Sequence, residues 1–233
     1  MGIVTLDPRL VITSGLSATG KSTTLEEVAR RISNSFILEK DAINQSMLHV
    51  VPTEDLRLLP FDEYVKGDSV FPDHARNVET PFGEMIKIDP ANGYYGRHAR
   101  DQTYIVMANI AYGNMKNGKV PLLDCIVIRQ IRDGTVKKFM DQPMLADYPK
   151  YLIHFVTGEE ECYQRHLARA KTNPEAAIRD AKKISSRDAF HRFVTEEQPM
   201  TPEELKKYDH LILDTSKRSP AECAREFIEY ISN

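Results

Sequence analysis

The chain has 233 residues, of which 41% are hydrophobic and 28% are charged, an ordinary composition for a folded, water-soluble protein. This length is enough for one α/β domain with insertions and is short for two independent hydrophobic cores. The formal net charge of -3 argues against a general nucleic-acid-binding protein.

The cysteines and the first residues exclude several further classes. The three cysteines are far apart and form no CxxC pair, so neither a zinc site nor a disulfide framework is indicated. The opening MGIVTLDPRLVITSG contains too short an apolar run for a secretory signal, and Leu6 stands where a myristoylation signal needs Ser or Thr. No stretch approaches the length of a membrane span. We therefore expect a cytoplasmic protein without a membrane partner.

Short apolar runs alternate along the chain with longer stretches of helical spacing. The runs, which we interpret as strands, cover residues 10–13, 36–38, 120–127, 151–156 and 210–213. The clearest helical stretches cover residues 21–32, 102–115 and 221–231. Strands that alternate with helices predict an α/β fold, in which a parallel sheet is covered on both faces.

Two regions interrupt this alternation. Residues 48–100 contain five prolines between Pro52 and Pro90, a density that excludes a long helix. Residues 165–209 are highly charged and mainly helical in pattern. We interpret the chain as one domain, residues 1–233, in which the first region is an acceptor-binding insertion and the second is a lid.

The most specific motif is GLSATGKS, residues 15–22, which matches G-x-x-x-x-G-K-[ST] between a predicted strand and a predicted helix. Its glycines, Gly15 and Gly20, permit backbone torsions that a side chain would forbid. The amides of the loop can then converge on phosphate oxygens, at the positive end of the following helix. A chance match is improbable in this setting, so the sequence predicts a binding site for the phosphates of ATP or GTP.

Individual residues of this loop have separate predicted roles. Lys21 reaches the β and γ phosphates as a cation. Ser22 offers a hydroxyl ligand to Mg²⁺, and Thr23 can bond the α phosphate. The residues expected to hold the nucleotide through the loop are Gly15, Ser17, Ala18, Thr19, Gly20, Lys21, Ser22 and Thr23.

Two aspartates follow predicted strands, where ligands bind in an open parallel sheet. Asp124 ends the third strand and is a candidate for the Mg²⁺ shell. Asp41 follows the second strand and is a candidate base for an acceptor hydroxyl. Each has a structural alternative: Asp41 can cap a helix that starts at Ala42, and Asp124 can cap or bond a neighbouring loop.

Arginines near a transferred phosphoryl group stabilise its charge, so arginines outside the loop are further candidates. Arg165 and Arg169 are four residues apart and share one helix face, and Arg132 follows the third strand after a short loop. The alternative for each is a solvated charge on a helix surface. We predict that these three arginines act in catalysis, together with Lys21 and Asp41.

The order of these features resembles the zeta-toxin-like and gluconate-kinase-like P-loop kinases, a group of AAA-type ATP-binding proteins related to the nucleoside monophosphate kinases. The resemblance rests on GLSATGKS, on the aspartate in EKDAIN, on the helix and strand of ARDQTYIVMANIAYGNMKNGKVPLLDC, and on HLILDTS. It implies a P-loop three-layer sandwich with a five-stranded parallel sheet in the order 2-3-1-4-5 and a helical lid. It also implies ATP with Mg²⁺, and places Thr215 near the nucleobase.

The function that follows is a kinase that transfers the γ phosphate to a hydroxyl of a small metabolite, sugar or antibiotic. Two alternatives stay open: a kinase for a nucleotide or a polynucleotide 5′-hydroxyl, and an NTP-driven switch. The insertion is longer than in compact small-molecule kinases, so the resemblance does not identify the acceptor. Candidates for its pocket are Arg97 and Arg100, which can meet an anion, and Tyr94 and Tyr95, which can stack on a ring.

Overall fold

The computed structural model describes residues 2–47, 49–50, 75–80, 83–88, 100–173, 177, 180–181, 183–197 and 200–233. The chain divides into two compact units. Unit 1 comprises Met1–Leu38 and Ala111–Asn233, and unit 2 comprises Glu39–Ile110. The P-loop motif, the predicted lid and most of the strands belong to unit 1.

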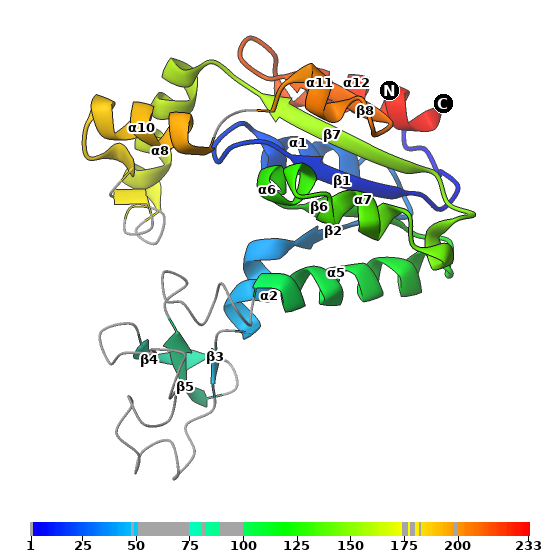
Figure 1. Ribbon diagram of the computed structural model, residues 1–233, viewed down its shortest axis with the longest axis horizontal. Coiled ribbons are helices and arrows are strands. Elements are labelled where there is room, and N and C mark those ends of the chain that lie inside the picture. Colours follow the sequence, from blue (N-terminus) through cyan, green and yellow to red (C-terminus); the bar gives the residue numbers. More distant parts are fainter. Residues whose placement is uncertain are drawn as a thin grey trace. The chain divides into compact units, whose positions relative to one another are not determined.

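Five strands form the main sheet: β1 (Leu10–Ser14), β2 (Ser35–Glu39), β6 (Val120–Asp124), β7 (Lys150–Val156) and β8 (His210–Asp214). Their order is β2-β6-β1-β7-β8 (Figure 1). When these five strands are numbered along the chain, this order is the predicted 2-3-1-4-5. Strand β1 pairs in parallel with both β6 and β7, and β7 pairs in parallel with β8. The predicted parallel sheet is confirmed.

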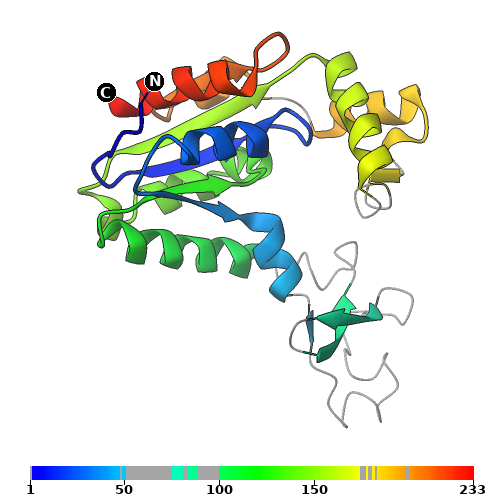
Figure 2. The ribbon, with the colours of Figure 1, turned by 180° about the vertical axis from the view of Figure 1, so that it is seen from behind.

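Helices cover both faces of this sheet. Helices α1 (Lys21–Ala29) and α12 (Pro220–Ser232) pack on one face, which is seen from the front in Figure 2. Their apolar side chains form one buried cluster with alternate residues of the central strands, including Val11, Ile153 and Phe227. Helices α6 (Ile128–Arg132) and α7 (Thr135–Met140) lie on the opposite face. The three-layer sandwich is therefore confirmed.

The third predicted strand is shorter in the structure than the apolar run that indicated it. Strand β6 ends at Asp124, and α6 begins at Ile128, so the end of the run lies in the turn that joins them. Buried apolar residues continue across this turn, including Cys125 and Val127. Hydrophobicity alone therefore extended the predicted strand too far, because the turn after it is apolar and two of its side chains are buried.

The described secondary structure between β7 and β8, which includes the charged region of residues 165–209, is helical. Its elements are α8 (Glu159–Thr172), α10 (Arg187–Glu197) and α11 (Pro202–Leu205), and the short helix η3 (Pro143–Leu145) precedes β7. Helix α8 begins with three glutamates, whose charge suits the positive end of a helix dipole. Helix α11 begins with a capping box between Thr201 and Glu204.

Unit 2 contains α2 (Lys40–Met47), the first part of α5 (Arg100–Met115) and a small antiparallel sheet. This sheet has the order β3-β5-β4, formed by β3 (His49–Val50), β4 (Ala75–Thr80) and β5 (Gly83–Ile88). The sequence indicated no strands there, because proline and loop residues dominate its pattern. Three predicted pocket residues, Tyr94, Tyr95 and Arg97, lie outside the described residues, and Arg100 begins α5.

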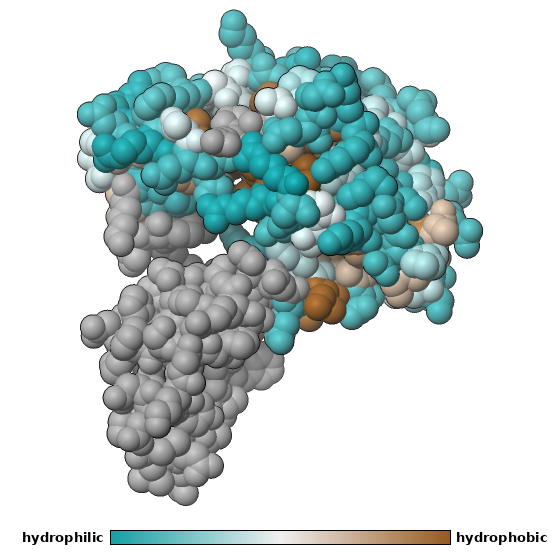
Figure 3. Space-filling view, in the orientation of Figure 1, coloured by the Kyte–Doolittle hydropathy of each residue, from teal (hydrophilic) through white to brown (hydrophobic). Residues whose placement is uncertain are grey.

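No helix within the described part of the chain is long and apolar enough to cross a membrane. The described surface visible in Figure 3 is mostly hydrophilic.

Candidate functional site

The P-loop, residues 15–20, joins β1 to α1 through three residues with positive φ. Gly15 has φ +128°, and a Cβ atom at this position would overlap the carbonyl oxygen of Phe155 on β7. Gly20 has φ +86° and caps the N-terminus of α1. Ala18, with φ +64°, is the only non-glycine residue of the described chain in this conformation. The loop thus has the backbone that the motif predicted, and it lies at the N-terminus of a helix that is buried on one face.

Lys21 is the first residue of α1, its side chain reaches back into this loop, and it is only 7% exposed. Its Nζ atom donates hydrogen bonds to the carbonyl oxygens of Gly15, at 2.9 Å, and Leu16, at 2.7 Å. The Thr19 hydroxyl donates to the same Leu16 oxygen at 2.8 Å. The ammonium group is therefore held inside the loop by main-chain oxygens, and its contact with nucleotide phosphates stays a prediction.

Ser22 and Asp124 meet at the carboxyl end of the sheet. The Ser22 hydroxyl donates to Oδ2 of Asp124 at 2.6 Å. Asp124 is the last residue of β6, and β6 is joined to β1 through the Thr13 hydroxyl, which donates to the Leu123 carbonyl at 2.8 Å. A hydroxyl and a carboxylate in this arrangement supply the hard oxygen ligands that Mg²⁺ prefers. Thr23 follows in the first turn of α1 and is exposed.

The described residues contain no group of three or more His, Cys, Asp or Glu side chains that could hold a metal ion without help. Mg²⁺ needs no such cage, because it keeps several waters and takes its remaining ligands from one or two side chains and from phosphates. The pair Ser22 and Asp124 fits this requirement.

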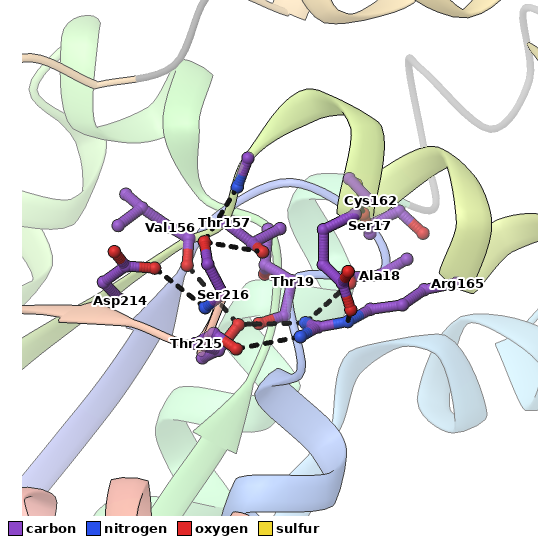
Figure 4. A network of polar contacts seen from close by, with 12 residues as sticks. Ser17, Ala18, Thr19, Val156, Thr157, Cys162, Arg165, Asp214, Thr215 and Ser216 are labelled. Carbon is purple, nitrogen blue, oxygen red and sulfur yellow. Dashed lines mark hydrogen bonds and ion pairs between the residues drawn. The ribbon is translucent and has the colours of Figure 1, made fainter. Parts of the chain in front are cut away.

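Arg165 of α8 lies against the P-loop and the end of β8 (Figure 4). Its Nη1 atom donates to the Thr215 hydroxyl at 2.9 Å, and its Nη2 atom donates to the Thr215 carbonyl at 2.8 Å. The Thr215 hydroxyl in turn donates to the carbonyl of Thr19 at 2.8 Å. Arg165 and Thr215, both predicted site residues, are therefore joined to each other and to the P-loop.

The segment after β8 is also tied to the segment after β7 (Figure 4). The Ser216 amide donates to Oδ1 of Asp214 at 2.8 Å, and the Gly158 amide donates to the Ser216 hydroxyl at 3.0 Å. The hydroxyls of Thr157 and Ser216 lie 3.2 Å apart. These bonds fix Thr215, the residue between Asp214 and Ser216, beside the loop.

A second pair of contacts joins α8 to Ser17 of the loop. The Cys162 thiol donates to the Ser17 carbonyl at 3.0 Å, and Nη2 of Arg169 donates to the Ser17 hydroxyl at 3.2 Å. Burial raises the pKa of Cys162 to about 11, so the thiol stays protonated and can donate. Cys162, Arg165 and Arg169 recur at spacings of three and four, so one face of α8 lies against the loop.

Arg132, the third predicted arginine, has partners on the helices after α8. Its Nε atom donates to Oε1 of Glu204 at 2.7 Å, and its Nη1 atom donates to the Glu197 carbonyl at 3.3 Å. The hydrogen bond from Arg132 lowers the pKa of Glu204 to about 2. A catalytic role for Arg132 stays a prediction, and its observed contacts join α6 to α10 and α11.

Asp41 belongs to unit 2 and is exposed. Helix α2 begins already at Lys40, so Asp41 lies in the first turn rather than at the cap of a helix that starts at Ala42. An acidic residue in a first turn is stabilised by the helix dipole, so this position has a structural explanation of its own. The role of Asp41 as a base stays a prediction.

Sequence reasoning missed four buried side chains around the loop: Cys162, His166, Asp180 and His154. Cys162 and His166 carried a usable signal, because they share the helical face of Arg165 and Arg169. Asp180 and His154 carried none, since a single aspartate in a charged segment and a single histidine in a strand are common.

Comparison with known proteins agrees with this arrangement. The family model described as an AAA domain matches residues 10–189 of the chain. No curated protein matches it in sequence.

Three solved structures share the fold. The APS kinase of Mycobacterium tuberculosis, determined with AMPPNP and APS, is 15% identical, has a TM-score of 0.54, and is matched over 98% of this chain and 99% of that chain. A gluconokinase from Sinorhizobium meliloti 1021 is 14% identical, with a TM-score of 0.52 over 97% and 93% of the two chains. The tunicamycin resistance protein of Deinococcus radiodurans is 12% identical, with a TM-score of 0.52 over 96% and 95%. Likeness at these identities is evidence for the fold.

Proposed function

Because the chain belongs to the AAA domain family, whose P-loop implies nucleotide binding, we propose that it is a kinase that uses ATP with Mg²⁺. The phosphoryl group transferred is the γ phosphate, and the acceptor is a hydroxyl group of a small molecule. The fold neighbours include an APS kinase and a gluconokinase, which supports this reaction class.

The observation that carries the proposal is the convergence of three kinds of polar group on the loop. The Lys21 ammonium lies at the carbonyls of Gly15 and Leu16. The Ser22 hydroxyl and the Asp124 carboxylate lie 2.6 Å apart at its end. Guanidinium groups reach it from α8. Phosphoryl transfer is catalysed mainly by positioning and by stabilisation of charge, and these groups supply both.

Each of these groups has a distinct task in the proposed reaction. Lys21 exchanges its carbonyl partners for phosphate oxygens when a nucleotide enters the loop. Ser22 and Asp124 would hold Mg²⁺, which neutralises phosphate charge when it is bound. Arg165 and Arg169 of α8 lie against the loop residues and stabilise the charge that spreads over the transferred group.

Acceptor-stimulated turnover tests the reaction class. Release of ADP from Mg·ATP is measured with panels of sugars, sugar acids, aminoglycosides, nucleosides and a 5′-hydroxyl oligonucleotide. We expect at least one small-molecule hydroxyl to raise turnover well above the rate with water, and the raised rate to vanish in Lys21→Ala. Labelled phosphate on the oligonucleotide would favour the polynucleotide alternative. Steady hydrolysis that no acceptor increases would favour an ATP-driven switch.

Asp41 is proposed as the base that accepts the proton of the acceptor hydroxyl. Asp41→Asn is expected to lower the acceptor-stimulated kcat by about a hundredfold, the ordinary size of general-base catalysis, and to leave the Kd for Mg·ATP unchanged. The matched control is Asp147→Asn, an exposed aspartate before β7 in unit 1. A large loss of Mg·ATP affinity in Asp41→Asn would instead place Asp41 at the metal.

A further inference from the structure

A carboxylate is fully buried next to the face of α8 that contacts the P-loop. Asp180 lies between α8 and α10 in the chain and is 0% exposed. Its Oδ2 atom accepts a hydrogen bond from Nη2 of Arg169 at 2.5 Å and lies 3.0 Å from Nδ1 of His166. Lys183 approaches Oδ1 at 3.4 Å. A buried charge is tolerated only when it is paired in this way.

The charge state of Asp180 follows from these contacts. Burial by itself would raise the pKa of Asp180, but the hydrogen bond with His166, the positive charge of Lys183 and the hydrogen bond from Arg169 together hold it well below its usual range. Asp180 is therefore an anion, and its attraction for the Arg169 guanidinium is strengthened by the buried surroundings.

The same guanidinium nitrogen that meets Asp180 also reaches the P-loop. Nη2 of Arg169 lies 2.5 Å from Oδ2 of Asp180 and 3.2 Å from the hydroxyl of Ser17. The His166 ring lies 3.1 Å from this nitrogen. An arginine has five N–H donors in a rigid fork, so contact with Asp180 on one side leaves other donors for a phosphate.

Asp180 itself is fixed by the packing of α8 against α10. Phe190 of α10 is 0% exposed, and its ring centroid lies 5.2 Å from that of Tyr163 and 5.5 Å from that of His166. Phe193 completes the group, 5.9 Å from Phe190. His166 thus connects an aromatic core on one side to Asp180 on the other. The carboxylate is anchored in a packed interior rather than in an exposed turn.

We propose that Asp180 is a positioning residue that, with His166, holds the Arg169 guanidinium against Ser17 for contact with nucleotide phosphates. The inference rests on the proposed function for the role of Arg169, and it adds a residue that neither the motif nor the fold assigns. Without the carboxylate, Arg169 is one flexible cation on a helix surface. With it, the guanidinium is set in place before the nucleotide arrives, so less conformational entropy is lost on binding.

Substitution of Asp180 separates this role from simple electrostatics, because the two predict opposite signs. If the carboxylate only repels phosphates, its neutralisation should tighten Mg·ATP binding. If the carboxylate positions Arg169, its neutralisation should weaken Mg·ATP binding. We expect Asp180→Asn to weaken Mg·ATP binding about fivefold and Arg169→Gln about tenfold, as for a hydrogen bond with a charged group. Affinity for AMP, which lacks the distal phosphates, should change less than about twofold.

The decisive measurement is a double-mutant cycle in Kd for Mg·ATP by titration calorimetry. In the Arg169→Gln background, Asp180→Asn should have no further effect, because its role acts through Arg169. The matched control is Asp188→Asn, an exposed carboxylate at the start of α10, which should bind as the unsubstituted protein does. Equal losses in both backgrounds, or unchanged or tighter binding by Asp180→Asn, would overturn the proposal.

A second variant covers the case in which Asp180→Asn does not fold. Arg169→Lys keeps a positive charge beside Asp180, but its single nitrogen would have to meet both Asp180 and Ser17, and it leaves no second donor nitrogen for a phosphate. It should lose Mg·ATP affinity nearly as Arg169→Gln does, and binding like that of the unsubstituted protein would refute the positioning role. If the unsubstituted protein binds Mg·ATP but no acceptor raises its turnover, the kinase proposal fails and the positioning role of Asp180 stands. If the unsubstituted protein binds no nucleotide, both proposals fail.

Discussion

The P-loop and the polar cluster formed by Asp180, His166 and Arg169 hold their cations in different ways. In the loop, the Lys21 ammonium is bonded to main-chain oxygens of Gly15 and Leu16. In the cluster, the Arg169 guanidinium is bonded to side-chain atoms of Asp180 and Ser17. The loop therefore depends on backbone shape, and the cluster depends on which side chains are present. A substitution should accordingly act on the loop through conformation or lost charge, and on the cluster through lost partners.

The largest expected effect is the loss of the loop cation itself. Lys21→Ala removes the charge that meets the phosphates and should lower acceptor-stimulated kcat/KM by about a thousandfold or more. The fold should survive, because the oxygens that Lys21 contacts belong to a loop held by other bonds as well. Turnover and circular dichroism are measured together. Lys137→Ala, which alters a half-buried lysine of α7 that pairs with Asp141, is the control and should retain full activity.

The next largest effect tests the dependence of the loop on backbone shape. Gly15→Ala places a Cβ atom against the carbonyl of Phe155 at φ +128°, which a side chain rarely adopts. We expect the free energy of unfolding to fall by roughly 3 kcal/mol or more. Denaturant unfolding measures the loss, and nucleotide affinity should fall with it.

A matched glycine sharpens this test. Gly113 lies inside α5, and a methyl group added there would have no atom within 4 Å, so Gly113→Ala meets open space. Alanine is the better helix former, and the variant should be more stable by about 0.5–1 kcal/mol. A similar loss of stability in both variants would show that the effect at Gly15 is not due to its backbone conformation.

The same contrast explains what the sequence could predict. The motif at residues 15–22 and the aspartate that ends β6 were predictable, because a strand, a loop and a helix in succession impose one backbone geometry. The sheet order came from the resemblance, and the alternation of elements supported the fold class. The contacts of Arg165 with Thr215 follow from the same layout, since both follow strands that end at one edge of the sheet.

The cluster could not be predicted in this way. Asp180 is one of many acidic residues in a charged segment, and nothing local distinguishes a buried aspartate from an exposed one such as Asp188. Its burial depends on Phe190 and His166, which lie ten and fourteen residues away in the chain. The small antiparallel sheet of unit 2 was missed for a related reason. Strand β3 pairs with β5, which lies more than thirty residues later in the sequence, and nothing local to either strand indicates its partner.

A third arrangement occurs in the middle of the main sheet. His154 on β7 pairs in register with Ser14, the residue before the loop, and both side chains are buried. Among the residues that the structure describes, neither ring nitrogen of His154 nor the Ser14 hydroxyl has a hydrogen-bond partner. Burial, and then the nearby charge of Lys21, lowers the pKa of His154 from 6.5 to about 4. His154 is therefore neutral in the folded protein near pH 7.

A smaller effect than the loss at Gly15 is a pH dependence of stability that arises from His154. Between pH 6.5 and pH 4 the unfolded chain binds a proton at this residue that the folded chain does not, so the free energy of unfolding decreases as the pH falls. From about pH 7 to pH 5 the contribution is roughly 2 kcal/mol, as an upper value. Denaturant unfolding at both pH values should show this decrease, and His154→Leu should lack it.

The control for this prediction is His191→Leu, which alters an exposed histidine of α10, 68% exposed at its side chain, and should keep the pH dependence of the unsubstituted protein. Equal slopes in all three proteins would mean that the pKa of His154 is the same in the folded and unfolded chains, which would contradict the prediction. A slope lost only in His154→Leu would instead establish that His154 is the source of the pH dependence, and that its imidazole is held neutral in the folded protein by burial and by the nearby charge of Lys21.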